Sequence, residues 1–378
     1  MEFEYGNPVK VLFGKEVLGE LSTLLNHKKV LLVYGSDSLK KSGTYGKIVE
    51  ELKKGGNTVY DFGGNSVPSY RKILEGIALV QKEGIEAVVG AGGCTVMDMA
   101  KIIGFGAVNP GLWSYLQLDK DPSGKKHLFT IEIPTYPSGG SEVDAAAECD
   151  DEATGKHGSL YGSYPDVALI NPELSYSLNK EMTAYSGFVA FCQLSTNYIG
   201  NESEMVKGMI GEALKEILKA TEKAIDEPED YGARSTISWG SVLSTQGFLS
   251  AFNYSNLGGA IYGMEGVAEE YGPMPYRKAI SLYFPRFLVL LSRWHPKEIR
   301  DYCVRVLDAD PELDAEEAAK FGEKKLIEWG EKHSVRMYID DLGFPYDERK
   351  LYSLTYAGDE YSHTDLFESF KRCFHKIA

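Results

Sequence analysis

Two glycine-rich turns are the parts of this 378-residue sequence that could hold a phosphate group. In the first, a buried strand pattern beginning at Ala87 leads into a turn and then into a helical pattern. The turn residues are Gly92, Gly93, Cys94 and Thr95. Glycine lets the backbone approach a ligand closely, and free N–H groups at a helix start attract an anion. On these residues alone, a turn that only reverses the chain remains the alternative.

Two further turns follow strand patterns and could face the same ligand. Residues 134–142 form the second glycine-rich turn, which contains Thr135, Ser138 and Gly139. The third turn follows the strand pattern at residues 30–34 and contains Ser36, Asp37 and Ser38. Because a nucleotide lies across the carboxyl ends of neighbouring parallel strands, the three turns together predict a dinucleotide crevice.

The elements that must position these turns follow from the hydrophobic pattern. From residue 9 to about residue 135, short apolar runs alternate with amphipathic stretches, which indicates a parallel sheet covered by helices. We expect strands at Val9–Phe13, Val30–Tyr34, Thr58–Asp61, Ala87–Gly90, Leu128–Ile133 and Val167–Ile170, and helices at Leu39–Lys54 and Tyr70–Glu83. The pattern predicts a doubly wound α/β domain over residues 1–180.

The second half of the chain is expected to be an all-α domain over residues 181–378. Long helical patterns occupy Ser203–Ile225, Trp239–Phe252, Lys278–Arg293 and Ala315–Lys332, and strand-like alternation is scarce. A charged segment with a proline, residues 226–232, separates the first two of these patterns.

Composition excludes several classes of partner. Lysine and arginine total 40 against 55 acidic residues, and the resulting net charge of −15 would repel nucleic acid and an anionic membrane. No run approaches the roughly 20 apolar residues of a membrane span, and residues 1–5 lack the features of a signal peptide. The five cysteines form no CxxC pair, so neither a disulfide framework nor a thiolate zinc site is indicated. We therefore expect a cytoplasmic protein.

The motifs taken together resemble the iron-containing alcohol dehydrogenases, in particular their branch of butanol dehydrogenases and aldehyde reductases. The resemblance rests on residues 34–43, 92–101 and 139–142, with Tyr164-Pro-Asp, Asn171-Pro-Glu-Leu and Thr183-Ala-Tyr. It runs through nearly the whole chain. It implies the fold shared with dehydroquinate synthase, in which a dinucleotide-binding α/β domain precedes an all-helical domain. It also implies NADP or NAD as cofactor, a small alcohol or aldehyde as substrate, and a homodimer.

The resemblance also assigns cofactor contacts. The first turn with Asp98, and the second turn, match the family's nucleotide-binding motifs, and His157 falls where the family has a lysine beside the cofactor. Ser36 stands where relatives that prefer NAD carry an aspartate, so a 2′-phosphate has room beside Ser38. Asp37 favours a free ribose hydroxyl instead. We expect NADP, with NAD as the alternative.

The sequence departs from the family at the metal site. Four positions correspond to the family's metal ligands, and they hold Val189, Gln193, Tyr262 and Tyr276. An alkyl group, an amide and two phenols are not plausible iron or zinc ligands, so no metal is predicted. The acidic residues at 142–151 are interpreted as a solvated face, since they lack the loop spacing of a calcium site.

The chemistry that remains without a metal centres on the two tyrosines. A phenol can donate a hydrogen bond or a proton to a developing alkoxide, so Tyr262 or Tyr276 is the hypothetical electrophile of a metal-free carbonyl reduction. Two phenols that only fill the vacated space are the alternative. A catalytically inactive relative that binds a nucleotide, and a non-redox enzyme on the same fold, also remain open.

Overall fold

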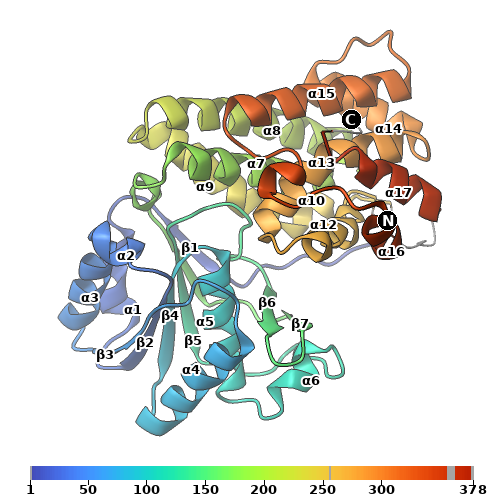
Figure 1. Ribbon diagram of the computed structural model, residues 1–378. Helices are drawn as coiled ribbons and strands as arrows, with labels where there is room; N and C mark the ends of the chain where they lie inside the picture. The colour runs from blue at the N-terminus through green and yellow to red at the C-terminus, as the bar shows by residue number, and fades with distance from the viewer. Residues whose placement is uncertain (1, 255–256, 356–361, 376–378) are drawn as a thin grey trace. The chain divides into compact units, whose positions relative to one another are not determined.

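The structure is a computed structural model that describes residues 2–254, 257–355 and 362–375. The chain divides into two compact units. The α/β unit comprises Gly6–Ser177, and the helical unit comprises Met1–Tyr5 with Leu178–Ala378. Both are drawn in Figure 1, and each is described by itself below. The division into domains at residues 1–180 and 181–378 stays a prediction.

A parallel sheet of six strands forms the centre of the α/β unit, as predicted. Its order is β1-β8-β5-β4-β2-β3. The strands are β1 (Lys10–Phe13), β2 (Lys29–Tyr34), β3 (Thr58–Phe62), β4 (Ala87–Gly92), β5 (Phe129–Pro134) and β8 (Val167–Ile170). Strand β1 lies at an edge of the sheet, where an unpaired backbone could meet a second copy of the chain. The homodimer itself stays a prediction.

Helices cover both faces of this sheet, and each face has its own hydrophobic core (Figure 1). One face carries η1 (Val17–Glu20), α1 (Leu21–Leu24), α2 (Ser38–Lys41) and α3 (Thr44–Lys54), and the other carries α4 (Tyr70–Glu83) and α5 (Cys94–Gly106). A short 3-10 helix, η2 (Pro172–Ser175), follows the last strand. The doubly wound arrangement expected from the sequence is confirmed.

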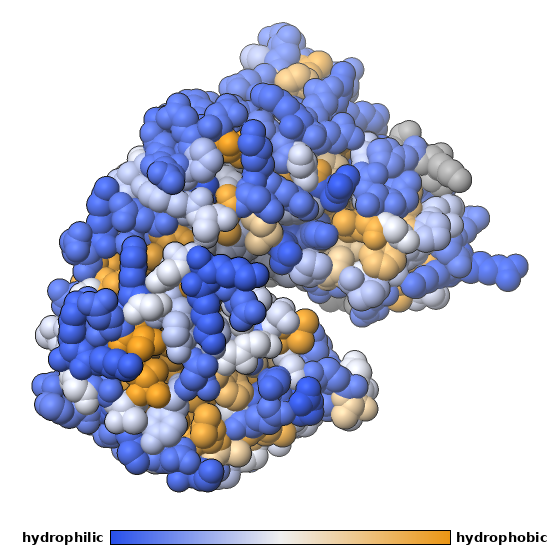
Figure 2. All heavy atoms as spheres, turned by 60° about the vertical axis from the view of Figure 1, so that its left-hand side comes forward, coloured by the Kyte–Doolittle hydropathy of each residue, from blue (hydrophilic) through white to orange (hydrophobic). Residues whose placement is uncertain are grey.

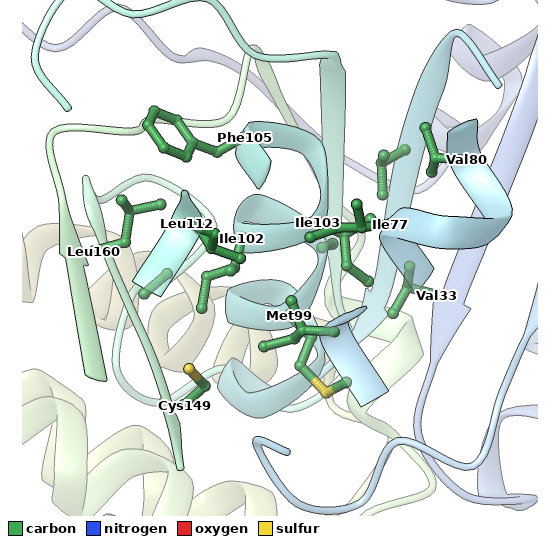
Figure 3. Close-up of a cluster of buried hydrophobic side chains, with 14 of the residues drawn as sticks. Val33, Ile77, Val80, Met99, Ile102, Ile103, Phe105, Leu112, Cys149 and Leu160 are labelled. Carbon is green, nitrogen blue, oxygen red and sulfur yellow. The ribbon is translucent and has the colours of Figure 1, made fainter. Parts of the chain in front are cut away.

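Helix α5 is buried nearly all round, because a hairpin covers the side that the sheet and α4 leave open. Strands β6 (Ala146–Asp151) and β7 (Lys156–Tyr161) pair antiparallel, next to α6 (Leu112–Leu116). Figure 3 shows Cys149 and Leu160 of the hairpin on the side of α5 that carries Ile102, with Ile77 of α4 beside Ile103. This packing fixes the position of the first turn of α5.

This hairpin was not predicted from the sequence. Its β6 strand alternates buried Ala147 and Cys149 with exposed Glu148 and Asp150. The acidic residues occupy the solvent side of the strand, so a half-buried strand had the composition of a loop. Gly155 has a positive φ of 67° in the turn between the two strands.

The helical unit contains only helices and turns among the residues that the structure describes, apart from one isolated bridge. Its helices are α7 (Lys180–Tyr198), α8 (Glu204–Asp226), α9 (Tyr231–Ser244), α10 (Gly247–Ser250), α11 (Ile261–Met264), α12 (Gly266–Tyr271), α13 (Tyr276–Ser292), α14 (Pro296–Leu307), α15 (Ala315–Lys332), η3 (Asp340–Leu342), α16 (Glu348–Leu354) and α17 (His363–Lys371). Asn179 caps α7, and a capping box of Asp314 and Glu317 begins α15.

Two of the predicted helices are wrong in their extent. The stretch Leu39–Lys54 is split into α2 and α3, because Gly43 adopts a left-handed conformation with a φ of 79°. The stretch Trp239–Phe252 is also split. Helix α9 begins earlier, where Asp230 caps it, and ends at Ser244, after which the side chains of Thr245 and Gln246 bond the carbonyl of Val242.

No helix within the described ranges is both long and apolar enough to cross a bilayer. Hydrophilic residues cover most of the face drawn in Figure 2, and hydrophobic residues appear there as scattered patches.

Candidate functional site

The three turns singled out in the sequence all follow neighbouring parallel strands. Strands β5, β4 and β2 are adjacent in the sheet, so their carboxyl ends lie along one edge. From β2 the chain continues to β3, its neighbour on one side, and then to β4, its neighbour on the other side. The carboxyl ends of β2 and β4 therefore form a topological switch point. A Cβ built on Gly35 would lie 3.4 Å from the side chain of Val96, so the turn after β2 is close to the start of α5.

The start of α5 offers free backbone donors. Gly93 is the N-cap with an extended backbone, and Cys94 is the first helical residue. The N–H groups of Val96 and Met97 bond the carbonyl of Gly93 at 3.0 and 3.2 Å. Within the described residues, the N–H groups of Cys94 and Thr95 have no acceptor. A helix of this length with two free N–H groups suits a phosphate group.

The second turn lies directly against the first. The N–H of Thr135 donates to the carbonyl of Gly92 at 2.8 Å, and the Cys94 Sγ lies 3.8 Å from the Ser138 Oγ. Burial raises the pKa of the Cys94 thiol to about 12, so the side chain is neutral near the proposed phosphate position. Gly139, which follows Ser138, contributes a backbone N–H close to the same thiol.

The third turn is exposed. The hydroxyls of Ser36 and Ser38 lie 3.1 Å apart, and Asp37 occupies the N-cap position of α2 without a capping hydrogen bond. Its carboxylate and the two hydroxyls can therefore face a ligand, as the cofactor prediction requires.

Asp98 and Lys101, both part of the motif noted in the sequence, link α5 to the second turn through a buried network whose other members were not predicted. The predicted contact of Asp98 with a cofactor stays a prediction. The Ser141 hydroxyl donates to Asp98 at 2.6 Å, and the ammonium of Lys101 lies 3.3 Å from Asp98 and 2.8 Å from Asp144. Lys101 also donates to the carbonyls of Ser141 and Ala146. Burial alone would lower the pKa of Lys101, but the neighbouring carboxylates raise it above its usual value. The signal was the i, i+3 spacing of Asp98 and Lys101 in an apolar helix.

This network corrects the interpretation of residues 142–151 as a solvated acidic face. Glu142 is fully buried, and Asp144 is partly buried against Lys101. Burial raises the pKa of Asp144 to about 6, with Lys101 acting in the opposite direction. Glu148 and Asp150 are exposed as expected, so the prediction fails only where the chain turns inward before β6.

Glu132 is a second buried acid that the sequence reasoning missed. It lies in the middle of β5, opposite Gly90, where an added Cβ would collide with its carboxyl group. Neither carboxyl oxygen has a hydrogen-bond partner within the described residues, and burial raises the pKa well above its usual value. One acidic residue inside the apolar run Thr-Ile-Glu-Ile was the available signal.

His157 lies on the exposed side of the hairpin rather than in the turns. Its Nδ1 is 2.8 Å from the Asp150 carboxylate, on the facing strand. The predicted contact between His157 and a cofactor stays a prediction.

In the helical unit, contacts connect three of the four residues that stand at the family's metal-ligand positions. Gln193 on α7 donates its amide N–H to the hydroxyl oxygen of Tyr276, at the start of α13, over 3.1 Å. The Tyr262 hydroxyl on α11 lies 3.4 Å from the Oγ1 of Thr196. Val189, the fourth position, is buried one turn before Gln193 on α7.

The environment keeps Tyr276 protonated. Burial raises its pKa well above the usual value, the charges of Tyr262 and Glu265 act in the same direction, and the bond from Gln193 acts against them. The phenol oxygen accepts from the Gln193 amide, and the Oε1 of the same amide has no hydrogen-bond partner within the described residues. A protonated phenol has a hydrogen to donate.

The donor set in this cluster does not fit iron or zinc. At the four positions that correspond to the family's ligands, an alkyl group, a carboxamide that already bonds a phenol, and two phenols offer neither an imidazole nor a carboxylate, and Glu265 is the one carboxylic acid that acts on Tyr276 in the described residues. Within the ranges described, no three or more His, Cys, Asp and Glu side chains are grouped so as to hold a metal ion.

Comparisons with known proteins agree with the fold. The family model described as iron-containing alcohol dehydrogenase matches residues 8–172. A probable NADH-dependent butanol dehydrogenase of Bacillus subtilis is 26% identical over 353 residues, covering 91% of this chain and 88% of that protein. The NADPH-dependent aldehyde reductase YqhD of Escherichia coli is 27% identical over 261 residues, covering 66% of each chain.

Solved structures give the same result over the full length. The crystal structure of an NADH-dependent butanol dehydrogenase A from Thermotoga maritima matches with a TM-score of 0.87 and 25% identity, covering 99% of this chain and 98% of that one. The family model matches the α/β unit, and the relatives extend the match through the helical unit. Residues 8–172 match the model of the iron-containing alcohol dehydrogenase family, and nearly the whole chain is similar in sequence and fold to proteins named as butanol dehydrogenases.

Proposed function

We propose that this protein is an NAD(P)-dependent oxidoreductase that interconverts a small aldehyde and an alcohol without the iron or zinc of its family. The relatives named as NADH-dependent butanol dehydrogenase and NADPH-dependent aldehyde reductase support the reaction class. The donor set at the tyrosine cluster supports the absence of the metal. The proposal concerns the metal-free chemistry, since family membership alone does not fix the activity.

The cofactor would bind at the three turns of the α/β unit. The free N–H groups of Cys94 and Thr95 would hold its diphosphate, with Ser138 and Gly139 beside them. Ser36, Asp37 and Ser38 would face the ribose of the adenosine half, where the hydroxyls favour NADP and the carboxylate favours NAD. When bound, the nicotinamide supplies or accepts the hydride that is exchanged with the carbonyl carbon.

The observation that carries the proposal is the bond from Gln193 to Tyr276. In a metal-dependent alcohol dehydrogenase, the metal polarises the carbonyl oxygen as a Lewis acid, a contribution of several kcal/mol. Here the hydroxyl of Tyr276 would donate its hydrogen to that oxygen, while Gln193 holds the phenol in place. Tyr262 would stand beside it as a second donor, bonded to Thr196.

The test is aldehyde reduction by a Tyr276→Phe variant, assayed on chelator-treated protein of known metal content. We expect the variant to lose about 100-fold or more in kcat, the usual effect of removing one donor to a developing oxyanion. Its affinity for NADPH, measured by fluorescence titration, should stay unchanged, because the cofactor turns lie in the other unit.

The matched control is Tyr302→Phe. Tyr302 is also a buried tyrosine of the helical unit, and its hydroxyl bonds Ser195 on α7 at 2.7 Å. The control variant should keep its turnover. Wild-type turnover in both Tyr276→Phe and Tyr262→Phe would refute the role of the tyrosines. Tight NADPH binding without any turnover in the wild type would favour an inactive nucleotide-binding relative instead.

A further inference from the structure

We propose that a cavity in the helical unit binds a small aliphatic monocarboxylate. The cavity has a volume of about 480 Å³, and α13, α15 and residues near the end of the described chain surround it. It lies within one unit and shares no residue with the tyrosine cluster. The proposal is therefore independent of the proposed function.

The cavity has a local surplus of positive charge in a strongly acidic protein. Four basic side chains line it, against three glutamates, whereas the whole chain has a net charge of −15. Two of the basic residues, Lys320 and Lys324, lie at its partly exposed side, with side chains 53% and 77% exposed. Lys320 pairs with Glu316, which does not line the cavity, at 2.7 Å, and Lys324 lies 3.8 Å from Glu328, so the buried positive charge that lacks a hydrogen-bonded carboxylate in the described residues is that of Arg286.

The centre of this charge is Arg286, which is fully buried on α13. Its Nη1 donates to the carbonyl of Leu282 at 2.7 Å, and its Nε donates to the carbonyl of Arg372 at 3.3 Å. Its Nη2 has no hydrogen-bond partner in the described part of the chain. A buried charged donor without an acceptor is costly, so this nitrogen favours a ligand that can accept from it.

Glu323, the carboxylate that forms an ion pair with Arg286 in the described ranges, is already engaged. Glu323 lies 3.9 Å from the Nε of Arg286, beyond hydrogen-bond distance, and it bonds Arg372 through both of its oxygens. Two guanidinium groups therefore share one carboxylate. A second carboxylate, supplied by a ligand, would accept a hydrogen bond from the Nη2 of Arg286, the one nitrogen of this guanidinium without a partner in the described part of the chain.

The rest of the lining selects among anions. Glu328 and Glu331 also line the cavity, so a phosphate, with a charge near −2, meets more repulsion there than a monoanion does. Ile327 and the ring of Tyr338 give the wall an apolar part, and the Arg286 guanidinium lies 4.7 Å from the centre of that ring. A carboxylate with a short alkyl chain satisfies both features.

The experiment measures binding of sodium butanoate to the intact protein by calorimetry, at constant ionic strength set with sodium chloride. Butanamide, which has the same shape without the charge, and inorganic phosphate are the comparison ligands. We expect saturable binding of butanoate, and much weaker binding of the other two. The Lys320→Gln/Lys324→Gln double variant should bind butanoate about fivefold more weakly, the effect of removing two partly exposed charges.

Three variants make the result specific. Lys332→Gln removes a lysine of the same helix α15 that does not line the cavity and should change nothing. Arg286→Lys keeps the charge but removes the planar fork, and should abolish most of the binding. Tyr276→Phe should bind butanoate as the wild type does, which separates this cavity from the proposed active site.

Either of two results would overturn the proposal. The first is no butanoate binding beyond that of butanamide, or stronger binding of phosphate. The second is unchanged butanoate affinity in the double lysine variant. Because Lys320 and Lys324 are exposed, this variant tests the site even if Arg286→Lys does not fold.

Discussion

The two units of the molecule build their candidate sites from different parts of the chain. In the α/β unit, the proposed phosphate position consists of backbone N–H groups at the start of α5. These groups have no acceptor within the described residues, although the first helical residue is Cys94 and not a glycine. In the helical unit, the cluster is made of the side chains of Gln193, Tyr262 and Tyr276 on three different helices.

The difference leads to an expectation about which of the two sites departs from the family that the sequence resembles. A backbone donor persists through most substitutions, so the geometry of the first turn survives a cysteine next to Gly93. A site made of side chains changes its chemistry with each substitution. The helices keep their packing here, because Gln193 and Tyr276 bond each other. We therefore expect cofactor binding to be preserved and the electrophile to be new.

The largest effect is expected from a charge placed at the backbone site. Thr95→Asp should weaken NADPH binding about 100-fold, since like charges in contact cost several kcal/mol. The same change should leave the fold at least as stable, because an acidic residue is favoured in the first turn of a helix. Fluorescence titration and thermal unfolding measure the two effects.

Thr95→Val is the matched control, since it removes the hydroxyl and adds no charge. NADPH affinity within about twofold of the wild type is expected. A large loss in Thr95→Val would show that the side chain, rather than the backbone, holds the cofactor, and the contrast between the units would fail.

A smaller effect is expected in the helical unit from the residue that positions Tyr276. Gln193→Leu should lower kcat about tenfold, the value of one lost hydrogen bond, with little change in KM. Thr196→Val, which loses the contact with Tyr262 instead, is the control and should change kcat less. Equal changes in both variants, or a change in KM alone, would contradict a positioning role for Gln193.

The smallest effect concerns stability, and it contrasts the buried acids of the two units. The raised pKa of Glu132 means that the folded state keeps a proton that the unfolded state releases above about pH 4.3. The stability contributed by this group is present below that pH and is lost as the pH rises toward the folded pKa. The side chain in Glu132→Gln does not ionise, so this pH-dependent loss of stability should disappear. The free energy of unfolding at pH 8 should rise by about 1 kcal/mol, as measured by urea unfolding at pH 5 and pH 8.

Glu323→Gln is the opposite case in the helical unit. Its carboxylate bonds Arg372 with both oxygens, so the variant leaves a guanidinium without its anion and should be destabilised at both pH values. If Glu132→Gln were also destabilised at pH 8, the carboxyl group would have a partner that the structure lacks.

The sequence predicted the parts of the molecule in which local pattern and packing agree. Strand β4 and the start of α5 are an apolar run followed by glycines, and both were located correctly. The hairpin β6–β7 was missed because its acidic side faces solvent, and the Lys101 network was missed because its partners are up to 45 residues apart in the chain. Glu142 and Glu132 were hidden for the same reason, since their burial depends on tertiary contacts.

The candidate site in the helical unit could be predicted only in part. The identity of Gln193, Tyr262 and Tyr276 came from the resemblance to the family, whereas the direction of the bond between Gln193 and Tyr276 needs the packing of α7 against α13. The cavity at Arg286 gave no sequence signal, because its charges come from α13, α15 and the segment after α17, and a basic residue on a helix usually faces solvent.

The most direct test of the account is the rate of NADPH-dependent aldehyde reduction per chain, plotted against the metal content of the same preparations. Preparations range from chelator-treated protein to protein incubated with iron or zinc. We predict a rate that does not change with metal content and that falls at least about 100-fold in Tyr276→Phe. A rate that rises in proportion to bound metal, and that vanishes in the metal-free protein, would contradict the central claim.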